Sequence, residues 1–379
     1  MNRSLLLLLV VQAFLLSPAF FVPHIENDEV IYKALAAQTT FVLQGYTLRG
    51  TSIFASLPAI YDTPLFFHPP VYILLGKALA ALVGENGFVV VSVAAALGTT
   101  LATFLLGKLM YGERAGLVAA ALWVLNPLQL FVAQRIWLDA LLVFFCCWSV
   151  YLYAAGIHRG LRYTFLAGVM LALGVLTKYT AILTVVPIVV LAVVYHRDLV
   201  TAKLARLVIC AMPAVLVLGW VYFFYTRTGA LVVVPAPTAA MLEQFPCSKM
   251  VFARPWYFFG VQTLLVCPVY LLAFLAVGKK IARATVVLAA WSGSYVAALT
   301  VYGVLGGGFA LRYILPAYPA LSLLAGSYVS THLKSTYLLT VVGCFIAIGC
   351  GTALINYGHV GAVDISNLFE GCYSGCSCR

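Results

Sequence analysis

Asp28 and Glu29 form an acidic pair just after the first apolar stretch of the chain. The chain has only 11 acidic residues among 379, and Glu26 adds a third to this short segment. Carboxylates at a membrane surface can act as a general base, a metal ligand or a cation site. Alternatively, the pair simply opens an interfacial helix, because acidic first-turn residues stabilise a helix and Glu29 can pair with Lys33 four positions on.

Polar residues of two further segments could take part in chemistry. His68 precedes Pro69-Pro70, which fix an extended entry to a helix and hold the imidazole rigidly. A surface histidine without a ligand is the alternative. Arg135 and Asp139 stand four positions apart, so they can pair with each other or orient a sugar or a phosphate.

Three cations border apolar runs. Lys178 lies between two such runs, where snorkelling to the interface would explain it, although we favour anion binding. Arg254 stands beside aromatic residues at a helix entry, and Arg312 stands next to Tyr313. An aromatic belt accounts for the rings. The arginines are better explained by a phosphate, which arginine binds through two parallel hydrogen bonds.

Composition indicates which elements must carry these residues. The chain is 64% hydrophobic and 9% charged, whereas about a quarter of the residues of soluble domains are charged. Repeated apolar runs near membrane-spanning length predict an all-α, polytopic membrane bundle. The net charge of +11 is explained by membrane topology, so we expect membrane lipids and no nucleic acid as partners.

We predict about eleven crossings, with the N-terminus inside and the C-terminus outside. The apolar run 70–84, which contains Lys77, is predicted to lie in the outer interface or to re-enter the membrane. The inner loops then carry twelve basic and two acidic residues, a net charge of +10 against +1 outside, as the positive-inside rule requires. The predicted crossings are 5–22, 88–108, 115–133, 138–155, 163–177, 180–195, 204–225, 257–278, 283–304, 313–331 and 336–355.

The chain is predicted to contain one transmembrane domain over 1–355, with long outer loops at 23–87 and 226–256, and an outer Cys-rich tail over 356–379. Residues 4–22 resemble a signal peptide, but no good cleavage site follows, so we expect an uncleaved helix, with cleavage as the alternative. The outer cysteines can form disulfides or stay free; they are Cys247, Cys372, Cys376 and Cys378.

Five motifs in sequence order resemble the GT-C superfamily of membrane glycosyltransferases, in its protein O-mannosyltransferase and aminoarabinose transferase branch. Nucleotide-loop, nucleophile-elbow and His-Glu-x-x-His motifs are absent from the sequence, so ATP-driven transport and zinc proteolysis are unsupported. The resemblance covers about residues 1–330 and implies a GT-C fold with a helical first outer loop. The five motifs are Asp28-Glu29, His68-Pro69-Pro70, the segment 135–142, Leu176-Thr177-Lys178 and the segment 312–319.

The resemblance implies inverting transfer of a sugar from a polyprenyl-phosphate donor to a protein, lipid or glycan acceptor. The reaction would take place at the extracytoplasmic face of a plasma membrane or an ER-type membrane. Asp28 would be the general base, and Glu29 would hold the acceptor or orient Asp28. The resemblance implies no cofactor and favours no metal, although Asp28, Glu29 and Asp139 can hold one divalent ion if the fold brings them together.

The departing phosphate needs cationic stabilisation more than protonation. Lys178 and Arg312 would supply it, with Arg254 or His68 as further candidates.

The same basic residues could also bind a lipid-linked anion without catalysing sugar transfer. The alternatives are therefore a transporter or flippase for a lipid-linked anion, and an inactive homologue. A proton-coupled carrier needs acidic groups at mid-depth, and the predicted crossings have none there. The stretch 86–92 lacks the arginine that relatives often place there, which leaves the acceptor open.

Overall fold

The computed structural model describes residues 2–21, 24, 27–56, 62, 64–195, 200–229, 256–276, 282–304 and 311–332. These residues form helices, turns and irregular segments, and no strand occurs among them. The α-helices are α1 (Arg3–Leu16), α2 (Asn27–Gln38), α3 (Val71–Val83), α4 (Gly87–Tyr111), α5 (Glu113–Val124), α6 (Pro127–Ala133), α7 (Asp139–Arg159), α8 (Leu161–Val175), α9 (Val185–Tyr195), α10 (Val200–Ala211), α11 (Ala214–Thr228), α14 (Phe258–Val266), α15 (Leu271–Leu275), α16 (Arg283–Val304) and α17 (Tyr318–His332). Shorter 3-10 helices are η1 (Ser17–Phe20), η2 (Phe54–Ser56), η4 (Gly84–Asn86), η5 (Tyr179–Thr184), η6 (Pro268–Tyr270) and η7 (Leu311–Ala317).

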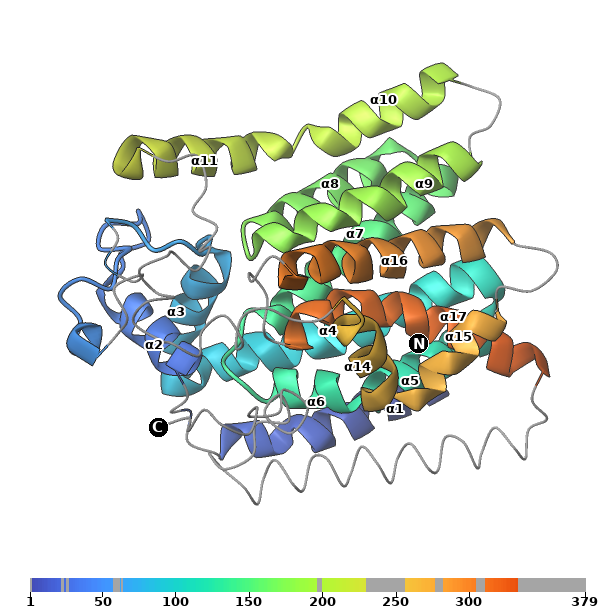
Figure 1. Ribbon diagram of the computed structural model, residues 1–379, viewed down its shortest axis with the longest axis horizontal. Coiled ribbons are helices and arrows are strands. Elements are labelled where there is room, and N and C mark those ends of the chain that lie inside the picture. The colour runs from blue at the N-terminus through green and yellow to red at the C-terminus, as the bar shows by residue number, and fades with distance from the viewer. Residues whose placement is uncertain are drawn as a thin grey trace.

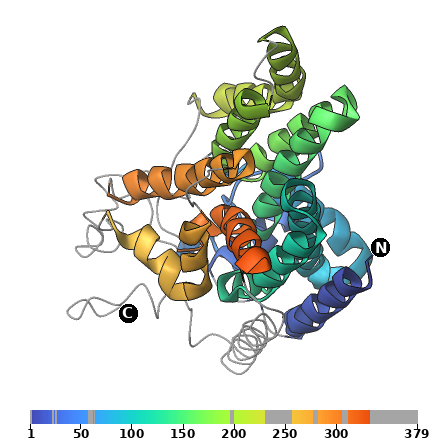
Figure 2. The same cartoon turned by 90° about the vertical axis from the view of Figure 1, so that its right-hand side faces the viewer.

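The long helices lie alongside one another as a bundle, with α2 and α3 gathered at one end (Figures 1 and 2). Close packing depends on small residues where the helices touch. A Cβ on Gly168 of α8 would lie 2.0 Å from the carbonyl oxygen of Cys210 in α10, and one on Gly326 of α17 would lie 2.8 Å from the amide nitrogen of Ala119 in α5. The bundle therefore leaves no room for side chains at these crossings.

Helices occupy ten of the eleven segments predicted to cross the membrane. Among the described residues, four helices are long and apolar enough to span, or up to six if each bent pair forms one span. The bent pairs are α5 with α6 and α10 with α11, at 62° and 41°. The protein is thus an integral membrane protein, whereas eleven crossings and an inside N-terminus stay predictions. The crossing 336–355, most of the loop 226–256 and the Cys-rich tail lie outside the described residues.

Helix α3 folds back on α4 through the 3-10 turn η4. The Tyr72 hydroxyl lies 3.2 Å from that of Ser92, and a Cβ on Gly76 would overlap the Phe88 ring. The apolar stretch from Val71 to Tyr111 is therefore two antiparallel helices and not one straight span. The predicted separate helix over 70–84 agrees with α3, while its place relative to the membrane remains a prediction.

Gly87→Ala is expected to destabilise the protein by about 1–3 kcal/mol through overpacking. A Cβ at this position would lie 2.2 Å from the amide nitrogen of Ala80, so the α3–α4 hairpin would have to open. Gly219 of α11 has open space around it, and Gly219→Ala is the matched control, expected to be neutral or slightly stabilising. Thermal unfolding of the purified variants in detergent measures both. Equal stability of the two would contradict the close approach.

Hydrogen bonds to main-chain carbonyls bring three segments to the same end of the bundle. The Val71 amide donates to the Leu176 carbonyl at 3.1 Å, and Lys77 Nζ donates to the Ala36 carbonyl at 2.7 Å. The Tyr46 hydroxyl donates to the His68 carbonyl at 2.8 Å. These contacts therefore join helix α2, the segment before α3 and the turn after α8, which carry Asp28, His68 and Lys178.

Candidate active site

Four charged residues from distant parts of the chain meet at this end of the bundle. Arg312 in η7 is ion-paired with Asp28 of α2, and its Nε lies 3.6 Å from Oδ2 of Asp139 at the start of α7. Asp139 Oδ1 accepts a hydrogen bond from Lys178 Nζ at 2.7 Å. The result is a continuous chain of alternating charge, Asp28–Arg312–Asp139–Lys178, with as many carboxylates as cations.

Local structure explains how each charge is presented. Asp139 opens α7, where a carboxylate is stabilised by the helix dipole. Lys178 follows α8 in an extended conformation, and its own amide donates to the Gly174 carbonyl at 2.9 Å. The Arg312 guanidinium lies 3.9 Å from the centre of the Trp137 ring, and Lys178 Nζ lies 3.9 Å from that of Tyr313. Both cations are thus held between a carboxylate and an aromatic face.

Asp28 has the most accessible side chain of these four charged residues. Its side chain is 27% exposed, compared with 2% for Asp139. Burial acts to raise the pKa of Asp28, but the positive charges of Arg312 and Lys178 outweigh it and hold that pKa below its ordinary value. Asp28 is therefore ionised at neutral pH and open to an incoming group, as a general base must be.

His68 lies against the rings of Phe67, at 4.6 Å, and Phe66, at 5.5 Å. Burial lowers the pKa of His68 to about 4, and Lys178 adds to this effect, while Asp28 opposes it. His68 is therefore neutral near pH 7. In this state the imidazole can hydrogen-bond a phosphate but lends it no positive charge, so a role of His68 at the phosphate stays a prediction.

His68 should make folding stability depend on pH. The pKa of His68 is 6.5 in the unfolded chain and about 4 in the folded protein, so the unfolded state binds a proton between these values and the folded state does not. Stability is therefore lost as the pH falls through this window. Between pH 7 and pH 5 the wild type should lose about 1–2 kcal/mol more than His68→Gln, measured by denaturation at each pH. Parallel pH profiles for the two proteins would disprove this.

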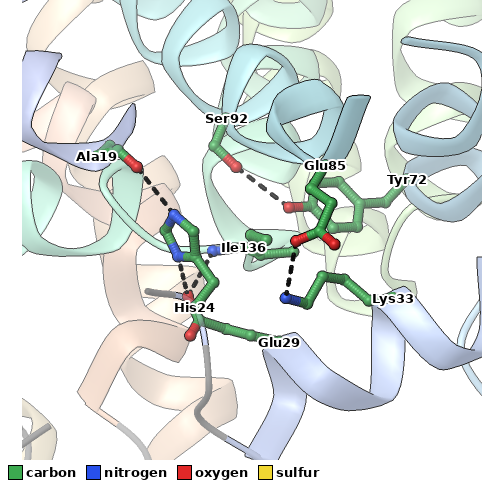
Figure 3. Close-up of polar contacts among 8 residues, drawn as sticks. All are labelled: Ala19, His24, Glu29, Lys33, Tyr72, Glu85, Ser92 and Ile136. Carbon is green, nitrogen blue, oxygen red and sulfur yellow. Dashed lines mark hydrogen bonds and ion pairs between the residues drawn. The ribbon is translucent and has the colours of Figure 1, made fainter. Parts of the chain in front are cut away.

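Glu29 does not pair with Lys33, as the alternative interpretation of the acidic pair expected. It is fully buried and accepts a hydrogen bond from the Ile136 amide at 3.0 Å. Lys33 instead lies 3.9 Å from Glu85 (Figure 3). The expected contact of Glu29 with an acceptor does not fit this burial, because Glu29 points into the protein.

Arg135 is among the charges that lower the pKa of Glu29, and it lies 5.2 Å from the Phe131 ring.

The predicted site is thus brought together in part. Asp28, Asp139, Lys178, Arg312 and Tyr313 meet, as their predicted place at one membrane face led us to expect. Arg135 lies on the Glu29 side, and Asp139 takes Lys178 and Arg312 as partners. Arg254 lies outside the described residues.

Trp137 is a site residue that sequence reasoning missed. Its indole supports the Arg312 guanidinium, and only 4% of the residue is exposed. Its position between Arg135 and Asp139 could have marked Trp137 as a site residue, but an interfacial tryptophan ordinarily indicates the aromatic belt. A partner 175 positions away cannot be inferred from such a pattern.

The carboxylates do not fit a divalent metal. Asp28 and Asp139 share Arg312 between them, and Glu29 binds elsewhere. No group of three or more His, Cys, Asp or Glu side chains suited to a metal occurs in the part of the chain that the structure describes. A metal held by Asp28, Glu29 and Asp139 together, an option open from the sequence, is not supported by this arrangement.

A protein-family model described as dolichyl-phosphate-mannose-protein mannosyltransferase matches residues 67–223. The matched segment contains His68, Arg135, Asp139 and Lys178, whereas Asp28 and Arg312 lie outside it. No curated protein sequence matches the chain.

Solved structures share the fold over nearly the whole chain. ArnT from Cupriavidus metallidurans, bound to undecaprenyl phosphate, aligns with 97% of this chain and 77% of its own at 14% identity, with a TM-score of 0.64. The Archaeoglobus fulgidus oligosaccharyltransferase tethered to an acceptor peptide aligns with 96% of this chain and 56% of its own at 13% identity, with a TM-score of 0.60. The chain thus spans about three quarters of the first enzyme and little more than half of the second. Over residues 67–223 the chain is thus similar to the dolichyl-phosphate-mannose-protein mannosyltransferase family, and over nearly its whole length it shares the fold of these two enzymes.

Proposed function

We propose that the protein transfers a sugar from a polyprenyl-phosphate donor to an acceptor hydroxyl, with inversion at the anomeric carbon. The observation that carries the proposal is the partly exposed Asp28 carboxylate, which is ion-paired with Arg312, while Asp139 joins Arg312 to Lys178. A base and two cations within one site are what an anionic leaving group and a hydroxyl nucleophile require. The binding of undecaprenyl phosphate by ArnT, a protein of the same fold, supports the class of donor.

In the proposed reaction the acceptor oxygen attacks the anomeric carbon from the face opposite the phosphate. The bond from that carbon to the phosphate oxygen breaks, and the polyprenyl phosphate leaves with both electrons. Asp28 takes the proton of the acceptor hydroxyl. The phosphate gains negative charge as it leaves, and Arg312 and Lys178 stabilise that charge. Because the phosphate is a good leaving group, no acid catalyst is needed.

The donor competes with Asp28 for Arg312. Within the site, Arg312 is ion-paired with Asp28, and Lys178 with Asp139. A phosphate that draws Arg312 towards itself weakens the hold on Asp28, whose pKa then rises towards its ordinary value. Asp28 thereby becomes a stronger base once the donor is bound. Neutral His68 is left to hydrogen-bond the donor.

The orientation of the protein belongs to the same proposal. The excess of basic residues in the predicted inner loops supports a site on the extracytoplasmic side, in a plasma membrane or an ER-type membrane. The first outer loop, 23–87, then supplies the base through α2. The acceptor is a protein, a lipid or a glycan, and peptide binding by the Archaeoglobus fulgidus enzyme favours testing peptides first.

Purified protein with a labelled polyprenyl-phosphate sugar and a panel of acceptors tests the proposal. Transfer that persists in chelator supports the metal-free mechanism. A flippase would instead move the lipid across proteoliposomes without forming a glycosylated product. An inactive homologue would bind polyprenyl phosphate and do neither, and each of these outcomes would refute the transferase.

A further inference from the structure

His24 joins the end of the first helix to α2 through a buried pair of contacts (Figure 3). Its Nε2 lies 2.9 Å from the carbonyl oxygen of Ala19 in η1. Its Nδ1 lies 2.8 Å from Oε1 of Glu29 in α2. His24 is 9% exposed and Glu29 is fully buried, so water does not substitute for either contact.

Hydrogen-bond stereochemistry determines the charge of this imidazole. A carbonyl oxygen can only accept, so the hydrogen on Nε2 is donated to Ala19. Oε1 of Glu29 already accepts from the Ile136 amide at 3.0 Å. The amide hydrogen bond from Ile136 stabilises the carboxylate form of Glu29, which can only accept. Nδ1 must therefore donate as well, and an imidazole that donates from both nitrogens is an imidazolium.

The pair spans the elements that build the candidate active site. Glu29 directly follows Asp28 in α2, so any shift of Glu29 moves that carboxylate. Ile136 directly precedes Trp137, on which the Arg312 guanidinium rests at 3.9 Å. Asp28, next to Glu29, and Asp139, three residues after Ile136, both contact the Arg312 guanidinium. The contact between Glu29 and Ile136 is thus a short link between the base and its cationic partner.

We infer that protonated His24 is a positioning residue, which sets the place of the Asp28 carboxylate through its ion pair with Glu29. This inference rests on the proposed function of Asp28 as base. His24 itself lies behind Glu29, away from the reacting groups. A displacement of about 1 Å at a reacting group can lower a rate on the order of 100-fold, so the pair should affect turnover more than binding.

Two substitutions separate positioning from simple stability. In His24→Asn the amide nitrogen takes the place of Nδ1 and keeps a donor towards Glu29. In His24→Gln it takes the place of Nε2 and keeps only the Ala19 contact. Each variant loses one hydrogen bond, so we expect similar losses of stability. Turnover should fall by roughly 10–100-fold in His24→Gln and by only a few-fold in His24→Asn. Affinity for polyprenyl phosphate should rise in His24→Gln, where Asp28 releases Arg312, and should stay unchanged in His24→Asn.

Lys33→Gln is the matched control, because it removes a partly exposed pair from the same helix. We expect it to leave turnover and stability unchanged. Equal losses of turnover in His24→Asn and His24→Gln, in step with their melting temperatures, would show that His24 is merely structural. Weakened binding of polyprenyl phosphate in His24→Gln alone would also overturn the inference.

A readout that needs no turnover separates this inference from the proposed function. A hydrophobic carbodiimide modifies carboxyl groups, and mass spectrometry locates the product on Asp28. A displaced Asp28 loses Arg312, its pKa rises and its labelling accelerates, so His24→Gln should label faster than wild type and His24→Asn should not. Equal labelling of the two variants overturns the positioning role. The expected labelling pattern in a protein that transfers no sugar would refute the proposed function alone.

Discussion

Asp28→Asn is expected to lower turnover by about 10²–10⁴-fold, the range that a general base supplies, and at the same time to tighten the binding of polyprenyl phosphate. Turnover falls while affinity rises because Asp28 has two roles in the site. It is the proposed base, and it also occupies the guanidinium that the donor phosphate needs. Asparagine cannot accept the proton, and it no longer competes as an anion. The gain in affinity should be on the order of tenfold, comparable to one charge-assisted hydrogen bond.

Any loss of negative charge near a phosphate raises affinity, so a double-mutant cycle is needed. Competition for Arg312 predicts that Asp28→Asn tightens binding in the wild type and has little effect in Arg312→Gln. General repulsion predicts the same gain in both backgrounds. Asp62→Asn is the matched control, since Asp62 pairs with Arg49 at 2.5 Å in the segment between α2 and α3 but is half exposed. Unchanged or weaker binding in Asp28→Asn would refute the exchange, and undiminished turnover would refute the base.

Asp139→Leu is expected to destabilise the protein by about 3–5 kcal/mol, as is usual when one partner of a buried ion pair is removed. Asp139 is 2% exposed and faces Lys178 at 2.7 Å and Arg312 at 3.6 Å. Its loss leaves Lys178 buried without a counter-ion. Glu113→Gln is the control: it breaks an exposed pair with Lys108, which should contribute less than about 1 kcal/mol.

Adding Lys178→Met to Asp139→Leu should recover most of the lost stability, because an apolar pair of similar volume often replaces a buried ion pair without penalty. Turnover should stay lost, since Lys178 is a proposed partner of the leaving phosphate. Chemical denaturation in detergent and the transfer assay measure the two properties separately. A double variant that is as unstable as Asp139→Leu, or that transfers sugar normally, would contradict this account.

Much of the fold could be predicted because membrane helices obey local rules. The predicted helix over 70–84 and the observed α3 (Val71–Val83) agree because prolines precede the helix and Gly84 follows it. The breaks at Pro127 and Pro213 were harder to foresee, and single predicted crossings proved to be bent pairs there. A bend depends on the neighbours that satisfy the freed main-chain groups, which sequence does not specify.

The sequence could predict which residues belong to the candidate site, but not which of them contact one another. Asp28, Lys178 and Arg312 were singled out because charge is rare in an apolar chain. The pairing of Glu29 with Lys33 followed the i,i+4 rule, which holds for exposed helix faces. Here tertiary burial takes precedence, because Glu29 lies on the inner face of α2 and meets the Ile136 amide. His24 carried no motif, and its partner Ala19 is a main-chain group that no residue type reveals.

The Asp28–Arg312 pair joins residues 284 positions apart, which has a consequence for biosynthesis. A ribosome that has just delivered α2 to the membrane must still make most of the chain before the counter-ion of Asp28 exists. Until η7 has been made, Asp28 lacks this counter-ion. If Asp28 is the base as proposed, a nascent chain that ends before residue 311 should contain the carboxylate without its partner and should transfer no sugar.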